Sequence, residues 1–411
     1  MRAFAIAIGY SMIASSAVGA QEPGAPILEY LGAFADGKGE YLAVSLIGSG
    51  ERQMLMLAET RTEQLRLLFP AGKESFYTGT TITQPKPVER AIEFLRERGT
   101  VEAIKILYVG QVPPRVYQRV PLRREEVKFV SGDVELRGTL YLQPRGTKRG
   151  PAIVLAHGSE VNDRNSFGPL PWVLAARGYV VLAYDKRGTG ASTGSWKDVG
   201  LEPLGADLAA AVEYVARRPE VDRLRIAVVG TSEGGWTAAI AARRTRYIRA
   251  IAAISGGART KGDAYVYKNR RLAVEAGLTG SRLDSAVAEA ETTIREAKNR
   301  VARDSTTITG FDRRVTYDPT NDWQLFRGAF LYMGGEADVL ESAPEAARWL
   351  DDLFQREGHR DYTIKLFPLG THSLLHAVNG SPAEFATLTG LRGLVPGYWS
   401  TLLRWLDDRL K

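Results

Sequence analysis

The chain contains 411 residues, more than one small domain needs, so its length predicts two domains. Hydrophobic residues make up 44% of the chain and charged residues 25%, which is typical of a soluble globular protein. The formal net charge of +7 comes from basic residues spread along the sequence, so we expect no nucleic-acid partner. Cysteine is absent, which excludes disulfides, thiolate zinc sites and a cysteine nucleophile.

Residues 1–20 have the pattern of a signal peptide. Arg2 gives a short positive start, residues 3–13 are apolar, and residues 18–20 are small enough to form a cleavage site. A membrane anchor is the alternative interpretation, but the apolar run is too short and too often interrupted. No later stretch of the sequence could span a bilayer. We therefore expect a periplasmic or secreted protein without a stable membrane span.

Residues 27–119 predict a small β-rich domain. Short strand-like runs such as 41–47 and 64–69 are separated by turn residues, among them Gly48-Ser49-Gly50. This stretch contains no histidine and no candidate catalytic constellation. We therefore expect an accessory domain that packs against the rest of the chain or shapes access to a site there.

From residue 124 the pattern changes to that of an α/β domain, which we expect to extend to residue 411. Two alternating strands at 126–130 and 134–142 flank a turn and predict a hairpin. Beyond them, helical stretches alternate with short apolar strands at 153–156, 180–184, 226–229, 251–254, 330–333 and 364–367. Continuous apolar strands that alternate with helices predict a mostly parallel sheet covered by helices on both faces.

Residues 258–326 interrupt this alternation. Apolar residues recur at helical spacing between Leu283 and Val301, with charged residues between them, which predicts an amphipathic helical insertion. The insertion could simply bury one face on the domain, or it could form a lid over a site. We favour the lid, because the insertion directly follows one of the central strands.

The stretch from residue 226 to 236 contains the first candidate for chemistry. An apolar strand stops at Gly230-Thr231-Ser232-Glu233-Gly234, and a helix-like stretch follows. A serine on a sharp turn between a strand and a helix is the arrangement of a nucleophile elbow. A side chain at Gly230 or Gly234 would collide with the neighbouring strand and helix, which explains both glycines. We predict Ser232 as a nucleophile, and an ordinary glycine-rich turn is the alternative.

A serine nucleophile needs a base, and the base needs an orienting carboxylate. The chain has four histidines, and His372 lies just past the last apolar strand, at the edge where open α/β sheets place their sites. We predict His372 as the base, and His376, one helical turn later, is the alternative. Asp338 follows the apolar strand at 330–333 and is the predicted acid, and Glu336 in the same loop is the alternative. The chain order Ser232, Asp338, His372 is the one expected of this type of sheet.

Two backbone N–H groups are expected to stabilise a developing oxyanion. One is the N–H of Glu233, directly after the serine. The other is the N–H of Ser159 in the turn His157-Gly158-Ser159, where the glycine lets the backbone bend. We expect His157 itself to brace this loop.

Together these motifs resemble the α/β-hydrolase family over about residues 124–411. The HG turn at 157–158, the D-x-R-G-x-G-x-S loop at 185–192 and the G-x-S-x-G elbow occur in the family's order. The runs HGSEVNDR, YDKRGTGASTGSW and GTSEGGW look like the branch of exported carboxylesterases and BAAT-like or dienelactone-hydrolase-like enzymes. Glu160 and Glu233 depart from that branch. Because both add negative charge near the site, they speak against an acidic acyl group.

The resemblance implies a serine hydrolase that cleaves small-molecule carboxylic esters through an acyl-enzyme intermediate, with no metal and no cofactor. An exported serine peptidase or amidase of the same fold is the first alternative, and a non-enzymatic binding protein is the second. Acyl and alcohol specificity and the oligomeric state stay open, because a fold-level likeness does not determine substrate.

Overall fold

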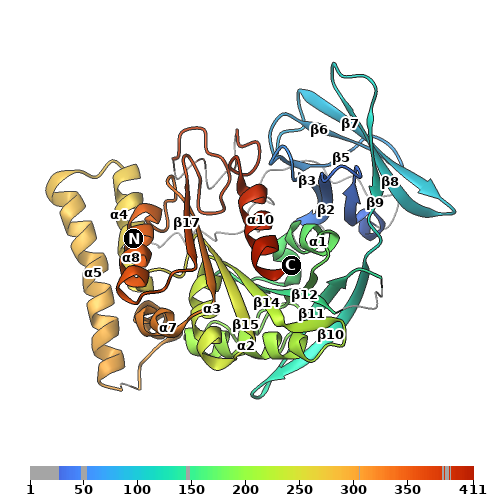
Figure 1. Ribbon diagram of the computed structural model, residues 1–411. Helices are drawn as coiled ribbons and strands as arrows, with labels where there is room; N and C mark the ends of the chain where they lie inside the picture. Colours follow the sequence, from blue (N-terminus) through green and yellow to red (C-terminus); the bar gives the residue numbers. More distant parts are fainter. Residues whose placement is uncertain are drawn as a thin grey trace.

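The computed structural model describes residues 27–47, 53–144, 149–304, 306–381, 384, 388 and 390–411. The expected signal peptide and the expected turn at residues 48–50 lie outside these residues. The described chain forms one sheet of nine strands and a second sheet of eight strands (Figure 1). The predicted combination of a β-rich N-terminal region with an α/β-hydrolase fold is confirmed.

The first sheet is antiparallel throughout and follows a short 3-10 helix, η2 (Ile27–Tyr30). Its strands are β1 (Gly32–Ala35), β2 (Tyr41–Ile47), β3 (Met54–Glu59), β4 (Leu65–Leu67), β5 (Phe69–Pro70), β6 (Ser75–Gly79), β7 (Val88–Glu97), β8 (Thr100–Tyr108) and β9 (Arg115–Arg119). The strand order is β4-β3-β2-β1-β9-β8-β7-β6-β5, so β4 and β5 lie at opposite ends of the order. Because only Leu68 separates these two strands in the chain, the sheet must curl back on itself.

The second sheet has the order β10-β11-β13-β12-β14-β15-β16-β17. Its strands are β10 (Arg123–Ser131), β11 (Val134–Leu142), β12 (Gly150–Ala156), β13 (Val180–Tyr184), β14 (Val221–Thr231), β15 (Ile248–Ile254), β16 (Ala329–Gly335) and β17 (Tyr362–Phe367). The pairs β10–β11 and β11–β13 are antiparallel, and all the other pairs are parallel. The carboxyl ends of the parallel strands therefore meet at one edge, where β14 ends at the residue before Ser232.

Helices cover both faces of the second sheet (Figure 1). They are α1 (Leu170–Ala176) and α10 (Tyr398–Leu410) on one face, and α2 (Leu201–Ala216), α3 (Glu233–Arg244) and α8 (Ala343–Arg356) on the other. Strand β12 shows why its sequence is apolar throughout. Ile153 and Leu155 enter the core under α1 and α10, whereas Val154 and Ala156 enter the core under α2 and α3.

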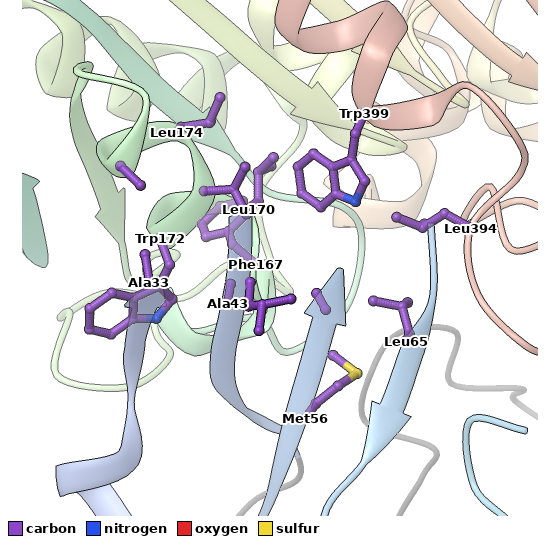
Figure 2. Close-up of a cluster of buried hydrophobic side chains, with 14 of the residues drawn as sticks. Ala33, Ala43, Met56, Leu65, Phe167, Leu170, Trp172, Leu174, Leu394 and Trp399 are labelled. Atoms are coloured by element: carbon purple, nitrogen blue, oxygen red, sulfur yellow. The ribbon is translucent and has the colours of Figure 1, made fainter. Parts of the chain in front are cut away.

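The first sheet packs on the α1 and α10 face, so the two sheets share one hydrophobic core. Figure 2 shows Ala33, Ala43, Met56 and Leu65 of the first sheet facing side chains of the other sheet's covering elements. Those side chains are Phe167, which ends the 3-10 helix η4 (Arg164–Phe167), together with Leu170, Trp172, Leu394 and Trp399. Burial on this scale makes the first sheet an integral support of α1 and α10.

The segment before α10 is also bonded to the edge of the first sheet. Leu65 N–H donates to Arg392 O at 3.3 Å, and Leu394 N–H donates to Glu63 O at 2.7 Å. The Glu63 carboxylate accepts from Trp399 N–H at 3.2 Å, in the first turn of α10. This contact satisfies a helix N-terminal donor with a residue of the turn between β3 and β4, more than three hundred residues earlier in the chain.

The insertion between β15 and β16 is helical, as expected, but it contains more than one helix. Its helices are α4 (Lys261–Glu275), α5 (Gly280–Ala302), α6 (Gly310–Val315) and α7 (Thr320–Leu325). Figure 1 shows α5 on the outside of the molecule, next to α4. Only Ala290, Ile294 and Ala297 of α5 are buried, so α5 covers the shorter helices rather than the sheet. Among the described residues, no helix combines the length and the apolarity that a bilayer span requires.

Candidate active site

Ser232 occupies a strained turn between β14 and α3. Its backbone angles are φ 54° and ψ −120°, a region that serine rarely adopts and that costs about 1–3 kcal/mol. The turn is held by Ser232 N–H, which donates to Ile254 O at 2.7 Å, and by Gly235 N–H, which donates to Ser232 O at 2.9 Å. The side chain is partly exposed at the carboxyl edge of the sheet.

The flanking glycines are required by close backbone contacts. A Cβ atom on Gly230 would lie 2.5 Å from Gly234 O, and a Cβ atom on Gly234 would lie 2.4 Å from Ala156 O. Both distances are far shorter than any non-bonded carbon–oxygen contact. A side chain at either position would therefore force the backbone of the strand-turn-helix unit to shift.

The structure brings Ser232, His372 and Asp338 into one hydrogen-bonded line. His372 Nε2 lies 2.9 Å from Ser232 Oγ, and His372 Nδ1 lies 2.7 Å from Asp338 Oδ2. Asp338 is only 2% exposed, and its Oδ1 accepts from the backbone N–H groups of Leu340 and Glu341. The anchored carboxylate accepts a hydrogen bond from the Nδ1–H group, so the proton stays on Nδ1 and the lone pair of Nε2 faces the serine hydroxyl.

The competing residues lie elsewhere. His376 is exposed and lines a different cavity, of about 880 Å³, between the first sheet and α10. Glu336 is exposed, whereas Asp338 is buried beside the imidazole. His359 is buried, and its Nε2 donates to Gly328 O at 2.9 Å.

His157 braces the loop that follows β12. Its Nε2–H donates to Tyr184 O, and its ring stacks on Phe167 with the centroids 4.4 Å apart. Burial and the nearby Lys186 ammonium lower the pKa of His157 to about 3, so the ring is neutral at physiological pH. This is the structural role that the sequence predicted.

Ser159 and Glu233 both lie on the wall of the cavity that contains Ser232 and His372. Glu233 is the first residue of α3, so its N–H belongs to the helix donors that have no partner within the helix. A Cβ atom on Gly158 would lie 3.5 Å from Ser232 Cβ, so the turn before Ser159 passes close to the serine.

The Glu233 side chain is buried in a cluster of positive charges. Lys186 Nζ lies 2.9 Å from its Oε1, Lys261 Nζ pairs with its Oε2, and Arg314 Nε lies 4.0 Å from Oε2. Burial alone would raise the pKa of Glu233, but the two ammonium groups outweigh it and hold the pKa well below its usual range. The expectation that Glu233 adds net negative charge to the site is wrong, because three cations surround this one carboxylate.

Sequence reasoning did not identify Lys186, Lys261 or Arg314. One signal was available, since a carboxylate next to a nucleophile elbow is buried and needs a counter-ion. Lys186 stands in the second position of the D-x-R-G loop, which ends at the same edge of the sheet. Asp185 and Arg187 of that loop serve as braces: Asp185 accepts from Arg164, and Arg187 pairs with the buried Asp207.

The cavity over Ser232 has a volume of about 400 Å³. The insertion contributes one wall through α4 and α6, and the C-terminal segment contributes another through Leu394, Tyr398 and Trp399. In the described part of the chain, no group of three or more histidine, aspartate or glutamate side chains could hold a metal ion. The arrangement can perform proton transfer at Ser232 next to a pocket large enough for a small acyl group.

A mostly parallel sheet with a strained serine turn at its centre is the architecture of the α/β-hydrolase superfamily. Residues 122–360, more than half of the chain, match the model of the X-Pro dipeptidyl-peptidase (S15) family. The protein therefore belongs to this family.

Similar proteins extend this comparison. An uncharacterised protein of Pseudomonas aeruginosa is 34% identical over 120 residues, which are 29% of this chain and 32% of that protein. The chain thus spans about a third of the length of this relative. The uncharacterised protein YcjY of Escherichia coli is 25% identical over 306 residues, 64% of this chain and 96% of that protein. The structure of the Pyrococcus horikoshii acylaminoacyl peptidase has a TM-score of 0.48 and 14% identity, over 87% of this chain and 55% of that chain.

Proposed function

We propose that this protein is a serine hydrolase that cleaves carboxylic esters through an acyl-enzyme intermediate. The observation that carries the proposal is the imidazole of His372, which lies within hydrogen-bond distance of both Ser232 and Asp338. Serine is a weak nucleophile at neutral pH, and a base in this geometry makes it reactive. Asp338 orients the imidazole and stabilises the imidazolium that forms.

The steps follow from this geometry. Ser232 Oγ attacks the ester carbonyl while His372 Nε2 takes its proton, and a tetrahedral oxyanion forms. The backbone N–H groups of Ser159 and Glu233 are the donors that we assign to that oxyanion. His372 then gives the proton to the leaving alcohol, and the acyl group stays on Ser232. A water molecule, deprotonated by His372, attacks the acyl group and releases the acid.

Cleavage of an amide or peptide bond is the second candidate, and membership of the S15 family supports it. The same three residues serve both reactions, so they do not separate an esterase from a peptidase. Parallel kinetics with ethyl butyrate, an unactivated ester, and with the tripeptide Ala-Pro-Ala, cleaved after its proline, distinguish the two. A larger kcat/KM for the ester supports the esterase assignment, and the reverse result supports the peptidase.

The rest of the chain has supporting roles in the proposal. The insertion at about 258–326 acts as a lid, since α4 and α6 line the cavity. The β-rich region at 27–119 is an accessory domain to the hydrolase domain at 124–411, and it shapes the cavity through its bonds to Leu394 and Trp399. The pattern of residues 1–20 supports a signal peptide and a periplasmic or secreted location.

The test compares Ser232→Ala with the wild-type protein on short-chain 4-nitrophenyl esters. We expect kcat to fall on the order of 10⁴-fold or more, because the nucleophile is gone while the cavity stays intact. Ser373→Ala is the matched control, because this serine lines the same cavity next to His372 and has no proposed part in the chemistry. Wild-type turnover in Ser232→Ala would refute the mechanism. Failure of a fluorophosphonate to label the folded wild-type protein would instead favour a non-enzymatic binding protein.

A further inference from the structure

Three cationic side chains line the cavity over Ser232. Lys261 and Lys268 come from α4, and Arg314 comes from α6. The two lysines are seven residues apart, which is about two helical turns, so they lie on the same face of α4. The side chains of Lys261 and Arg314 are largely buried, with exposed fractions of 17% and 13%. The insertion therefore presents a cationic wall to the cavity.

The carboxylates around the cavity do not neutralise this wall. Glu233 is already shared between Lys261 and Lys186, a fourth cation that lies behind the cavity surface. Glu341 lines the cavity, but burial and the nearby Asp338 raise its pKa well above the usual range and so disfavour its charged form. Glu160 is exposed at the rim, where water and salt screen its charge.

The cations keep unused capacity for an anion. Arg314 Nε is buried without a hydrogen-bond acceptor among the described residues. Lys268 forms no ion pair with any carboxylate in the described ranges. Burial and the like charges of Lys186 and Arg314 lower the pKa of Lys261, so a bound anion would relieve unfavourable charge there.

The position of the wall relates it to the reaction. Lys261 Nζ lies 3.5 Å from Ser159 Oγ, and Ser159 lines the cavity together with Ser232. The Trp196 ring forms cation–π contacts with two of the cations, since Lys186 Nζ lies 4.9 Å and Arg314 Cζ 5.4 Å from its centroid. The serine and the three cations therefore line one and the same cavity.

We infer that the cavity selects substrates that carry a carboxylate in addition to the bond that is cleaved, and that Lys261, Lys268 and Arg314 bind this carboxylate. The inference rests on the proposed hydrolase function and names the substrate class of the same site. It reverses the expectation from sequence, because the negative charge of Glu233 is more than compensated. Charge complementarity of this kind provides specificity by favouring the acidic substrate and leaving neutral analogues without a partner for the cations.

The experiment uses matched ester pairs in which one member carries a free carboxylate and the other its uncharged methyl ester. Monophenyl adipate and methyl phenyl adipate place the charge on the acyl side, whereas 4-acetoxybenzoate and its methyl ester place it on the alcohol side. We expect the wild-type protein to prefer the acid over the neutral ester by about tenfold or more in kcat/KM in at least one pair. Equal values within both pairs would overturn the inference.

Two variants assign the preference to the wall. Lys268→Met and Arg314→Met should each lower the acid-to-neutral ratio of kcat/KM by about fivefold or more, since each removes one cation. Damage to the fold would lower kcat/KM for the acid and for the neutral ester by the same factor. The ratio of the two values therefore reports on the cations alone. Lys298→Met, an exposed lysine on α5 outside the cavity, makes the same change in net charge and should leave the ratio as in wild type. An unchanged ratio in both cavity variants would overturn the assignment.

A binding measurement separates this inference from the proposed function. Calorimetry with Ser232→Ala should show tighter binding of monophenyl adipate or 4-acetoxybenzoate than of the matching methyl ester. Lys268→Met added to Ser232→Ala should remove that difference. If no ester is hydrolysed but the difference in binding is present, the proposed function fails and the anion site stands. If neutral esters are hydrolysed and no difference in binding exists for either pair, the anion site fails alone.

Discussion

Replacing Asp338 with asparagine separates the charge of this side chain from its shape. Asp338 Oδ1 accepts from Leu340 N–H at 2.7 Å and from Glu341 N–H at 3.1 Å. An asparagine keeps these two bonds only if its oxygen occupies the place of Oδ1, so its amide nitrogen must occupy the place of Oδ2. An N–H group then faces His372 Nδ1, where a carboxylate oxygen lies 2.7 Å away in the native protein.

Two N–H groups cannot donate to each other, so the imidazole of Asp338→Asn must carry its proton on Nε2. That proton faces Ser232, and His372 can no longer act as a base. We expect kcat for 4-nitrophenyl butyrate to fall by about 10³- to 10⁴-fold, with KM changed by less than about threefold. Glu336→Gln, on an exposed carboxylate of the same loop, should stay within about twofold of wild type. A variant Asp338→Asn that keeps more than about a tenth of the wild-type kcat would refute this reasoning.

Three further predictions concern stability. Burial raises the pKa of Glu63 to about 7, so folding takes up a proton there and stability falls as the pH rises from 4.5 to about 7. In the wild-type protein, we expect the free energy of unfolding in urea to fall by about 1–2 kcal/mol over this pH range, and Glu63→Gln should lack this loss. The same dependence of the unfolding free energy on pH in both proteins would contradict the expectation. Lys186→Met leaves the buried Glu233 with one ammonium group fewer and should cost about 3–5 kcal/mol in urea unfolding, whereas a loss under about 1 kcal/mol would count against a buried ion pair. Gly234→Ala places a Cβ atom 2.4 Å from Ala156 O, so thermal unfolding should reveal a loss of about 1–3 kcal/mol, and native stability would show that the turn can relax.

Much of the fold and of the candidate site follows from local sequence signals. The glycines on either side of Ser232 are dictated by backbone contacts within one strand-turn-helix unit, so a short motif predicts them. Asp338 and His372 are distant in sequence, but both follow parallel strands, and a rule about the edge of the sheet places them near Ser232. The alternation of apolar strands and helices predicts the α/β region because both faces of its sheet are buried.

The remaining features depend on pairings between distant segments that no local pattern encodes. Glu233 looks like an isolated negative charge in the sequence, and only the docking of α4 brings Lys261 to it. The hydrogen bonds of Glu63 and Leu65 join the N-terminal sheet to residues near the C-terminus, at and just before the start of α10. These contacts explain why the sequence predicted an accessory domain but not the residues through which it supports the cavity.

The proposed mechanism requires Ser232 to carry the acyl group during turnover, and mass spectrometry can identify the acylated residue. The protein is mixed with 4-nitrophenyl butyrate, quenched in acid within milliseconds, digested and analysed by mass spectrometry. We expect a butyryl group on Ser232 in the wild-type protein, much slower formation in His372→Ala, and no such adduct in Ser232→Ala. A butyryl group on another residue during turnover, or equal acylation of Ser232→Ala, would rule out Ser232 as the nucleophile.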